Sequence, residues 1–65
     1  MIFKLNKEIY PKKAIRRSIN FYKKIAKFKL KETKNYYIIS GKVEKEKEEL
    51  IMNEFVNFVL GIIRQ

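Results

Sequence analysis

The chain has 65 residues, with 16 Lys or Arg against 7 Asp or Glu and a formal net charge of +9 at pH 7. This length makes one domain, residues 1–65, and a domain of this size buries only about 60% of the surface of its unfolded chain. It contains no Cys and no His, which excludes disulfides, thiolate chemistry, imidazole bases and the usual zinc sites. We therefore expect a small domain whose stability gains from a partner.

Basic residues are concentrated in the first two thirds of the chain. Residues 1–43 carry 13 Lys or Arg and 2 Glu, whereas residues 44–65 carry 3 Lys or Arg and 5 Glu. A positive field of this kind attracts nucleic acids and acidic peptides, although it can also serve only to keep a small protein solvated. No apolar run approaches the roughly 20 residues that a bilayer span requires, and the N-terminus lacks the apolar core of a signal peptide. We expect a cytoplasmic protein with no membrane contact.

Residues 1–6 predict a short strand, with Phe3 and Leu5 on one side. Pro11 suits the first position of a helix, because its fixed φ is already helical and its missing N–H has no partner there. A helix is expected over residues 11–25, with its apolar and basic residues on opposite sides. The apolar side holds Ala14, Ile15, Ser18, Ile19, Phe21, Tyr22 and Ile25. We expect this side to pack on a sheet.

The stretch from Ala26 to Val43 predicts a β-hairpin. Apolar and basic residues alternate over residues 26–31, as in a strand with one wet face. Residues 32–35 form a polar connection of hairpin length, and residues 36–43 are rich in β-branched and aromatic side chains. This second strand is apolar on both faces, which favours a central position in the sheet.

The last helix is expected to begin in the charged segment at Glu44 and to run to the end of the chain. Its core stripe is predicted to be Leu50, Ile51, Phe55, Phe58 and Ile62. A second apolar seam consists of Met52, Val56, Val59, Leu60 and Ile63. Together the two sets span about twice the arc that one packed face needs. We expect the second seam to be exposed in a monomer and to bind a partner or a second copy; the alternative is an ordinary exposed tail.

The predicted order is therefore β-α-β-β-α, an α+β fold in two layers. It consists of a small three-stranded antiparallel sheet with both helices on one face. The face away from the helices is expected to carry Lys27, Lys29, Lys31, Tyr36 and Ile38.

Several short motifs occur in a characteristic order along the chain. They are a first strand ending in Leu5-Asn6, then Tyr10, Ala14-Ile15, the hairpin, Glu54-Phe55-Val56-Asn57, Leu60 and Arg64. This order resembles the HxsD proteins of His-Xaa-Ser peptide-modification systems. Phe55, Asn57, Leu60 and Arg64 are the positions that match individually. The resemblance implies a non-catalytic accessory protein encoded beside a radical-SAM maturase that modifies a ribosomally made peptide.

Two functions are weighed from these features. In the first, an extended segment of a precursor peptide adds to a sheet edge, basic side chains attract its acidic residues, and the second seam contacts the maturase or a second copy. In the second, a small nucleic-acid-binding protein uses the first helix and the open sheet face, where Tyr36 offers a stacking ring. The residues expected to contact a peptide or another polyanion are Lys27, Lys29, Lys31, Tyr36, Arg16 and Lys23.

An enzyme is the least expected class. Glu8 and Glu32 are isolated, and the other acids belong to the last segment without a base, a metal cluster or a phosphate-binding loop. We expect no catalytic residue, no cofactor and no metal. A structural or toxin-neutralising role is compatible with the same residues.

Overall fold

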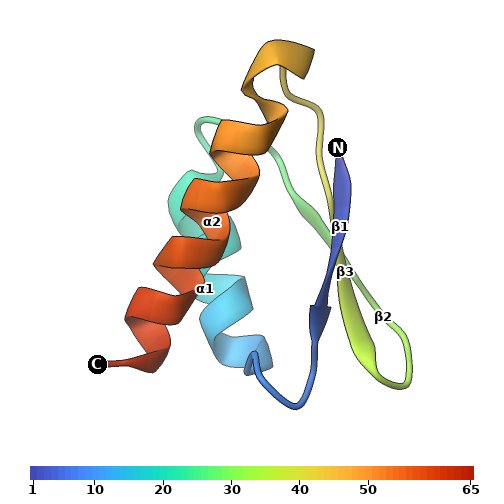
Figure 1. Ribbon diagram of the computed structural model, residues 1–65, viewed down its shortest axis with the longest axis vertical. Coiled ribbons are helices and arrows are strands. Elements are labelled where there is room, and N and C mark those ends of the chain that lie inside the picture. The colour runs from blue at the N-terminus through green and yellow to red at the C-terminus, as the bar shows by residue number, and fades with distance from the viewer.

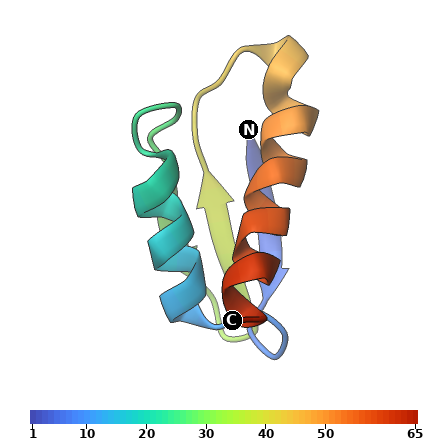
Figure 2. The same ribbon diagram turned by 90° about the vertical axis from the view of Figure 1, so that its left-hand side faces the viewer.

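The computed structural model describes residues 1–65 and has two layers, a sheet and a pair of helices (Figure 1). Both helices cover the same face of the sheet and run in opposite directions, as Figure 2 shows. The elements in chain order are β1 (Ile2–Asn6), α1 (Lys12–Tyr22), β2 (Lys29–Glu32), β3 (Tyr36–Ser40), the short 3-10 helix η1 (Lys45–Lys47) and α2 (Glu48–Ile63). The predicted α+β fold with both helices on one face is confirmed.

The strand β3 is central, because the sheet order is β1-β3-β2 and both pairs are antiparallel. Ile39 lies opposite Phe3 on one side and opposite Leu30 on the other. Side chains alternate along the strand, so Tyr37 and Ile39 face the helices and are buried. The predicted central position of the two-sided strand is confirmed.

The hairpin forms as predicted, but β2 is shorter and begins later than the alternation indicated. Ala26 and Phe28 are buried and Lys27 between them is exposed, yet pairing with β3 starts only at Lys29. Lys27 therefore precedes the strand. At the other end, the Thr33 N–H donates to the Tyr36 carbonyl at 2.9 Å, and the Tyr36 N–H donates to the Thr33 hydroxyl at 3.1 Å.

The helix α1 is amphipathic as predicted but ends at Tyr22, three residues early. The Tyr22 carbonyl accepts hydrogen bonds from the N–H groups of both Ile25 and Ala26, so the chain turns and places Ala26 in the core. This turn leaves Ile25 65% exposed, and Phe21 is 62% exposed. The prediction that these two residues face the sheet is wrong. Ser18 is fully buried, and its hydroxyl donates to the Ala14 carbonyl at 2.9 Å.

The helix α2 is rotated relative to the predicted core stripe. Its buried residues are Ile51, Phe55 and Val59. Leu50, predicted to be core, is 59% exposed, and Val59, predicted to be exposed, is completely buried. At 3.6 residues per turn, Val59 lies about 40° from Phe55 around the helix axis, whereas Leu50 lies about 140° away. The buried face of α2 is centred on Phe55, so Val59 falls inside this face and Leu50 falls outside it. Both predictions are wrong because they placed the centre of the buried face elsewhere on the helix.

The backbone at Gly41 lies against the ring of Phe28. A Cβ atom built on Gly41 would be 2.8 Å from Cδ1 and 3.2 Å from Cε1 of that ring. Phe28 is itself only 8% exposed and packs on Phe55, with 4.9 Å between the ring centroids. The glycine is needed here for close approach. Gly61 differs, because a Cβ atom on it would have no neighbour within 4 Å.

These two glycines give a matched pair of substitutions. Gly41→Ala should lower the free energy of unfolding by about 1–3 kcal/mol, because the buried Phe28 ring has to shift. Gly61→Ala should raise it by about 0.5–1 kcal/mol, because alanine is the better helix former at an exposed helical position. Urea unfolding followed by circular dichroism measures both. Equal stability of Gly41→Ala and the wild type would show that Phe28 does not hold the ring position described.

Candidate functional site

The structure divides the predicted polyanion-binding residues between two neighbouring surfaces. Lys29, Lys31 and Tyr36 belong to the face of the sheet that the helices leave open, and all three are exposed. Arg16 and Lys23 lie on the flank of α1 beside β2, where they line a groove. Lys27 is exposed in the segment that leads into β2. The free edge of β2 lies between the two surfaces.

The groove between α1 and β2 has a volume of about 470 Å³. Its apolar lining consists of Ile19, Phe28 and Leu30, and its polar lining of Lys12, Arg16, Asn20, Lys23 and Glu32. The α1 residues recur at spacings of three and four, so they lie on one side of that helix. An apolar floor with a basic rim is thus placed directly beside a strand edge.

The outer edge of β2 has no partner strand, because β2 pairs only with β3. Thr33 and Tyr36 form a hydrogen-bonded pair, and hydrogen-bonded and non-hydrogen-bonded pairs alternate along an antiparallel ladder. This alternation determines which residues of β2 direct their backbone N–H and C=O groups away from β3. Lys29 and Lys31 therefore direct their backbone groups toward β3. Leu30 and Glu32 direct theirs toward the free edge, where they can bind another extended chain.

Glu32 is the only acid lining this groove, and two lysines neutralise it. Its carboxylate forms ion pairs with the ammonium groups of Lys12 and Lys7, the latter at 2.8 Å. Hydrogen bonds from Lys12 first and Lys7 second lower the pKa of Glu32 from its ordinary value of 4.5 to about 2. These contacts tie β2 to the start of α1 and to the loop after β1. They also neutralise the negative charge at this end of the groove.

The lowered pKa of Glu32 predicts a pH dependence of stability. The contribution of its ion pairs is complete above pH 4.5, where the unfolded chain is also ionised, and is lost as pH falls toward 2. Wild type should therefore be more stable than Glu32→Gln near neutral pH, and the two should converge between pH 4.5 and 2. Urea midpoints across this range measure the difference. A difference that stays constant down to pH 2 would contradict the assigned ion pairs.

The open sheet face adds a basic residue that the sequence prediction left out. Lys4 lies opposite Ile38, which lies opposite Lys31, so an apolar residue of the central strand is flanked by lysines on both sides. The Lys4 ammonium is 5.4 Å from the ring centroid of Tyr36. The alternation of Lys4 with Phe3 and Leu5 in the first strand already carried this signal.

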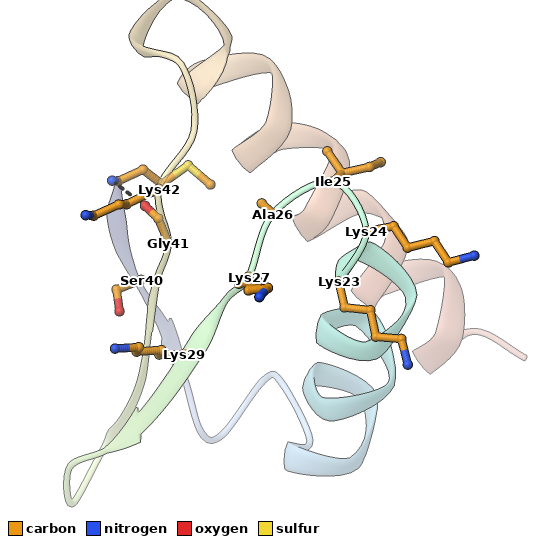
Figure 3. Close-up of a pocket in the computed structure, with 10 residues that line it drawn as sticks. Lys23, Lys24, Ile25, Ala26, Lys27, Lys29, Ser40, Gly41 and Lys42 are labelled. Carbon is orange, nitrogen blue, oxygen red and sulfur yellow. Dashed lines mark hydrogen bonds between the residues drawn. The ribbon is translucent and has the colours of Figure 1, made fainter.

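A second hollow, of about 640 Å³, lies between the α1–β2 connection and the end of β3. It is rich in lysines, but Figure 3 shows that their ammonium groups diverge. Those of Lys29 and Lys42 point to the open side of the sheet, and those of Lys23 and Lys24 point the other way. The hollow is therefore not a convergent anion site. Of its lysines, Lys23 also lines the groove between α1 and β2, and Lys29 belongs to the open face of the sheet.

The second seam on α2 is only partly exposed. Val59 belongs to the core, so its predicted role in partner binding is wrong, and Val56 packs against the core from its edge. Met52 and Val56 line a groove of about 500 Å³ beside β1, and Ile63 is 38% exposed. The larger exposed apolar side chains of the helix layer are Phe21, Ile25 and Leu50. Phe21 stacks on Phe58 of α2, with 4.3 Å between centroids.

No group of three or more acidic side chains is placed to hold a metal ion, and no helix has the length and apolarity needed to cross a membrane. The residues that match the HxsD pattern have ordinary structural positions: Phe55 is buried, Asn57 and Arg64 are exposed, and Leu60 is half-buried. No protein-family model matches the chain, and neither a curated protein nor a solved structure with significant similarity was found.

Proposed function

We propose that this protein is a non-catalytic accessory module that binds an acidic, extended segment of a precursor peptide along the β2 edge. The observation that carries the proposal is the combination of an unpaired strand edge with a basic-rimmed apolar groove beside it. The N–H groups of Leu30 and Glu32 can donate to the backbone of any extended chain and their carbonyl oxygens can accept from it, so the edge provides affinity without requiring one sequence. The basic side chains then select acidic partners.

The electrostatics of this edge support an acidic partner. Lys29 and Lys31 stand on one side of the edge, Arg16 and Lys23 on the other, and Glu32 is already paired. Exposed charges of this kind raise the association rate and discriminate against basic partners more than they add to affinity. A partner with several carboxylates along an extended strand fits this distribution.

The proposal includes the enzyme that the peptide would serve. The resemblance to HxsD proteins supports a radical-SAM maturase as that enzyme, acting in the cytoplasm. The helix layer is then the surface for contact with the maturase or a second copy. Its exposed apolar residues Phe21, Ile25 and Leu50, with Met52 and Ile63 of the second seam, support this assignment.

Charge reversal at the β2 edge tests the peptide assignment. Lys29→Glu/Lys31→Glu should weaken binding of a fluorescent acidic peptide about tenfold or more, because attraction becomes repulsion at two positions. The matched control is Lys13→Glu/Arg17→Glu, which removes the same charge from exposed positions on the side of α1 opposite the buried Ile15. Fluorescence anisotropy at low salt gives both affinities. Equal losses in the two variants would mean that only net charge matters and would sink the assignment to this edge.

A second candidate function is binding of single-stranded nucleic acid to the open sheet face. The observation that favours it is Tyr36, an exposed ring with the Lys4 ammonium 5.4 Å from its centroid. A base can stack on such a ring while lysines contact phosphates. Tyr36→Ala should then weaken binding of a short oligonucleotide and leave acidic-peptide binding unchanged. Oligonucleotide affinity that is indifferent to Tyr36→Ala would remove this candidate.

A further inference from the structure

We propose that the β2 edge selects peptides in which acidic and apolar residues alternate, with an acid–apolar–acid triplet as the minimal element. This inference rests on the proposed function and adds a sequence rule to it. Net positive charge alone would accept any acidic peptide. The two faces of β2, however, present different chemistry at successive positions, and an added strand must match them residue by residue.

The acidic positions of the triplet follow from the open face. Lys29 and Lys31 project to that side, two residues apart, and both are exposed. Peptide residues opposite these two lysines place their side chains on the same face, within reach of the ammonium groups. No acid of β2 or β3 faces that side to compete for the lysines, because Glu32 belongs to the helix-facing set. Carboxylates at these two peptide positions therefore gain opposite charges.

The apolar position follows from the groove. A peptide residue opposite Leu30 points to the helix side of the sheet, over the groove lined by Ile19, Phe28 and Leu30. Its volume of about 470 Å³ has room for a branched aliphatic or aromatic side chain. Arg16 and Lys23 stand at the rim and can cover such a side chain with their aliphatic stems. A polar residue over this apolar floor would lose its water without gaining a hydrogen-bond partner from the floor.

The backbone adds an independent constraint. In antiparallel pairing, the peptide residue opposite Leu30 forms the hydrogen-bonded pair, so its own N–H points toward β2. The N–H groups of the flanking acidic residues then point away from β2. In parallel pairing the assignment is reversed. In either orientation, the N–H groups that bond to β2 belong either to the apolar residues of the peptide or to its acidic residues, but not to both.

The first experiment compares two peptides on the wild-type protein. One alternates glutamate with leucine; the other has the same composition, with its leucines adjacent and its glutamates at the ends. The alternating peptide should bind about threefold more tightly or better, because the block peptide, with a leucine over the groove, places only one glutamate opposite a lysine. In the Leu30→Thr variant, which removes the aliphatic side chain but places a residue that strands favour at this position, the preference should shrink while binding persists.

The outcomes separate this rule from the function on which it rests. Equal affinities for the two peptides would overturn the alternation rule and leave acidic-peptide binding in place. No binding of either peptide would overturn both. Because the comparison is made on unaltered protein, it does not depend on the folding of any variant.

The second experiment uses alternating peptides that are N-methylated either on every leucine or on every glutamate. Pairing with β2 predicts that one form loses binding and the other keeps it, with the methylated leucines being the harmful ones in an antiparallel complex. If both forms bind alike, or if both fail, the peptide does not pair with the strand as proposed.

Discussion

The ring of Phe55 is the contact on which the whole structure depends. This residue of α2 has no exposed surface, and its ring lies 5.7 Å from Phe3 of β1, 5.8 Å from Tyr22 of α1 and 4.9 Å from Phe28 before β2, between centroids. One side chain of α2 therefore contacts α1, the edge strand β1 and the segment that leads into β2. Aromatic pairs at such separations add to the free energy gained by burial alone. In a domain with few buried residues, this cluster determines how the layers fit together.

The sheet could be predicted well from the sequence because side chains in a strand alternate between two faces, which leaves only two possible assignments of the buried face. Side chains of β3 alternate by geometry, so Tyr37 and Ile39 had to share one face, and the apolar character of the other residues indicated a central strand. The helix phases were harder. Apolar residues of α2 cover a wide arc, and nothing in the pattern distinguishes Val59 from Leu50. Their different burial follows from the position of Phe55, which is a tertiary contact.

The end of α1 had no local signal either. No glycine, asparagine or proline occurs in residues 23–32, and the chain turns after Tyr22 because Ala26 and Phe28 are drawn into the core. The candidate site was predictable only in part for the same reason. The alternation of residues showed which lysines share a face of the sheet. The groove, however, exists because α1 lies beside β2. The ion pairs of Glu32 with Lys7 and Lys12 likewise join residues that are far apart in the sequence. A pattern that describes single elements contains no information about these neighbours.

The lysines at the two sheet edges also bear on how copies of this chain behave at high concentration. An unpaired strand invites an identical strand, and repeated pairing leads to continuous intermolecular sheets. If two copies paired symmetrically through their β1 edges, centred on Lys4, the two Lys4 side chains would lie directly opposite each other. If they paired through their β2 edges, Lys29 and Lys31 of one copy would lie close to the same lysines of the other. Repulsion thus opposes fibril-like stacking at low ionic strength. Salt shortens the range of this repulsion, so the protection against self-assembly is a property of the solution as much as of the fold.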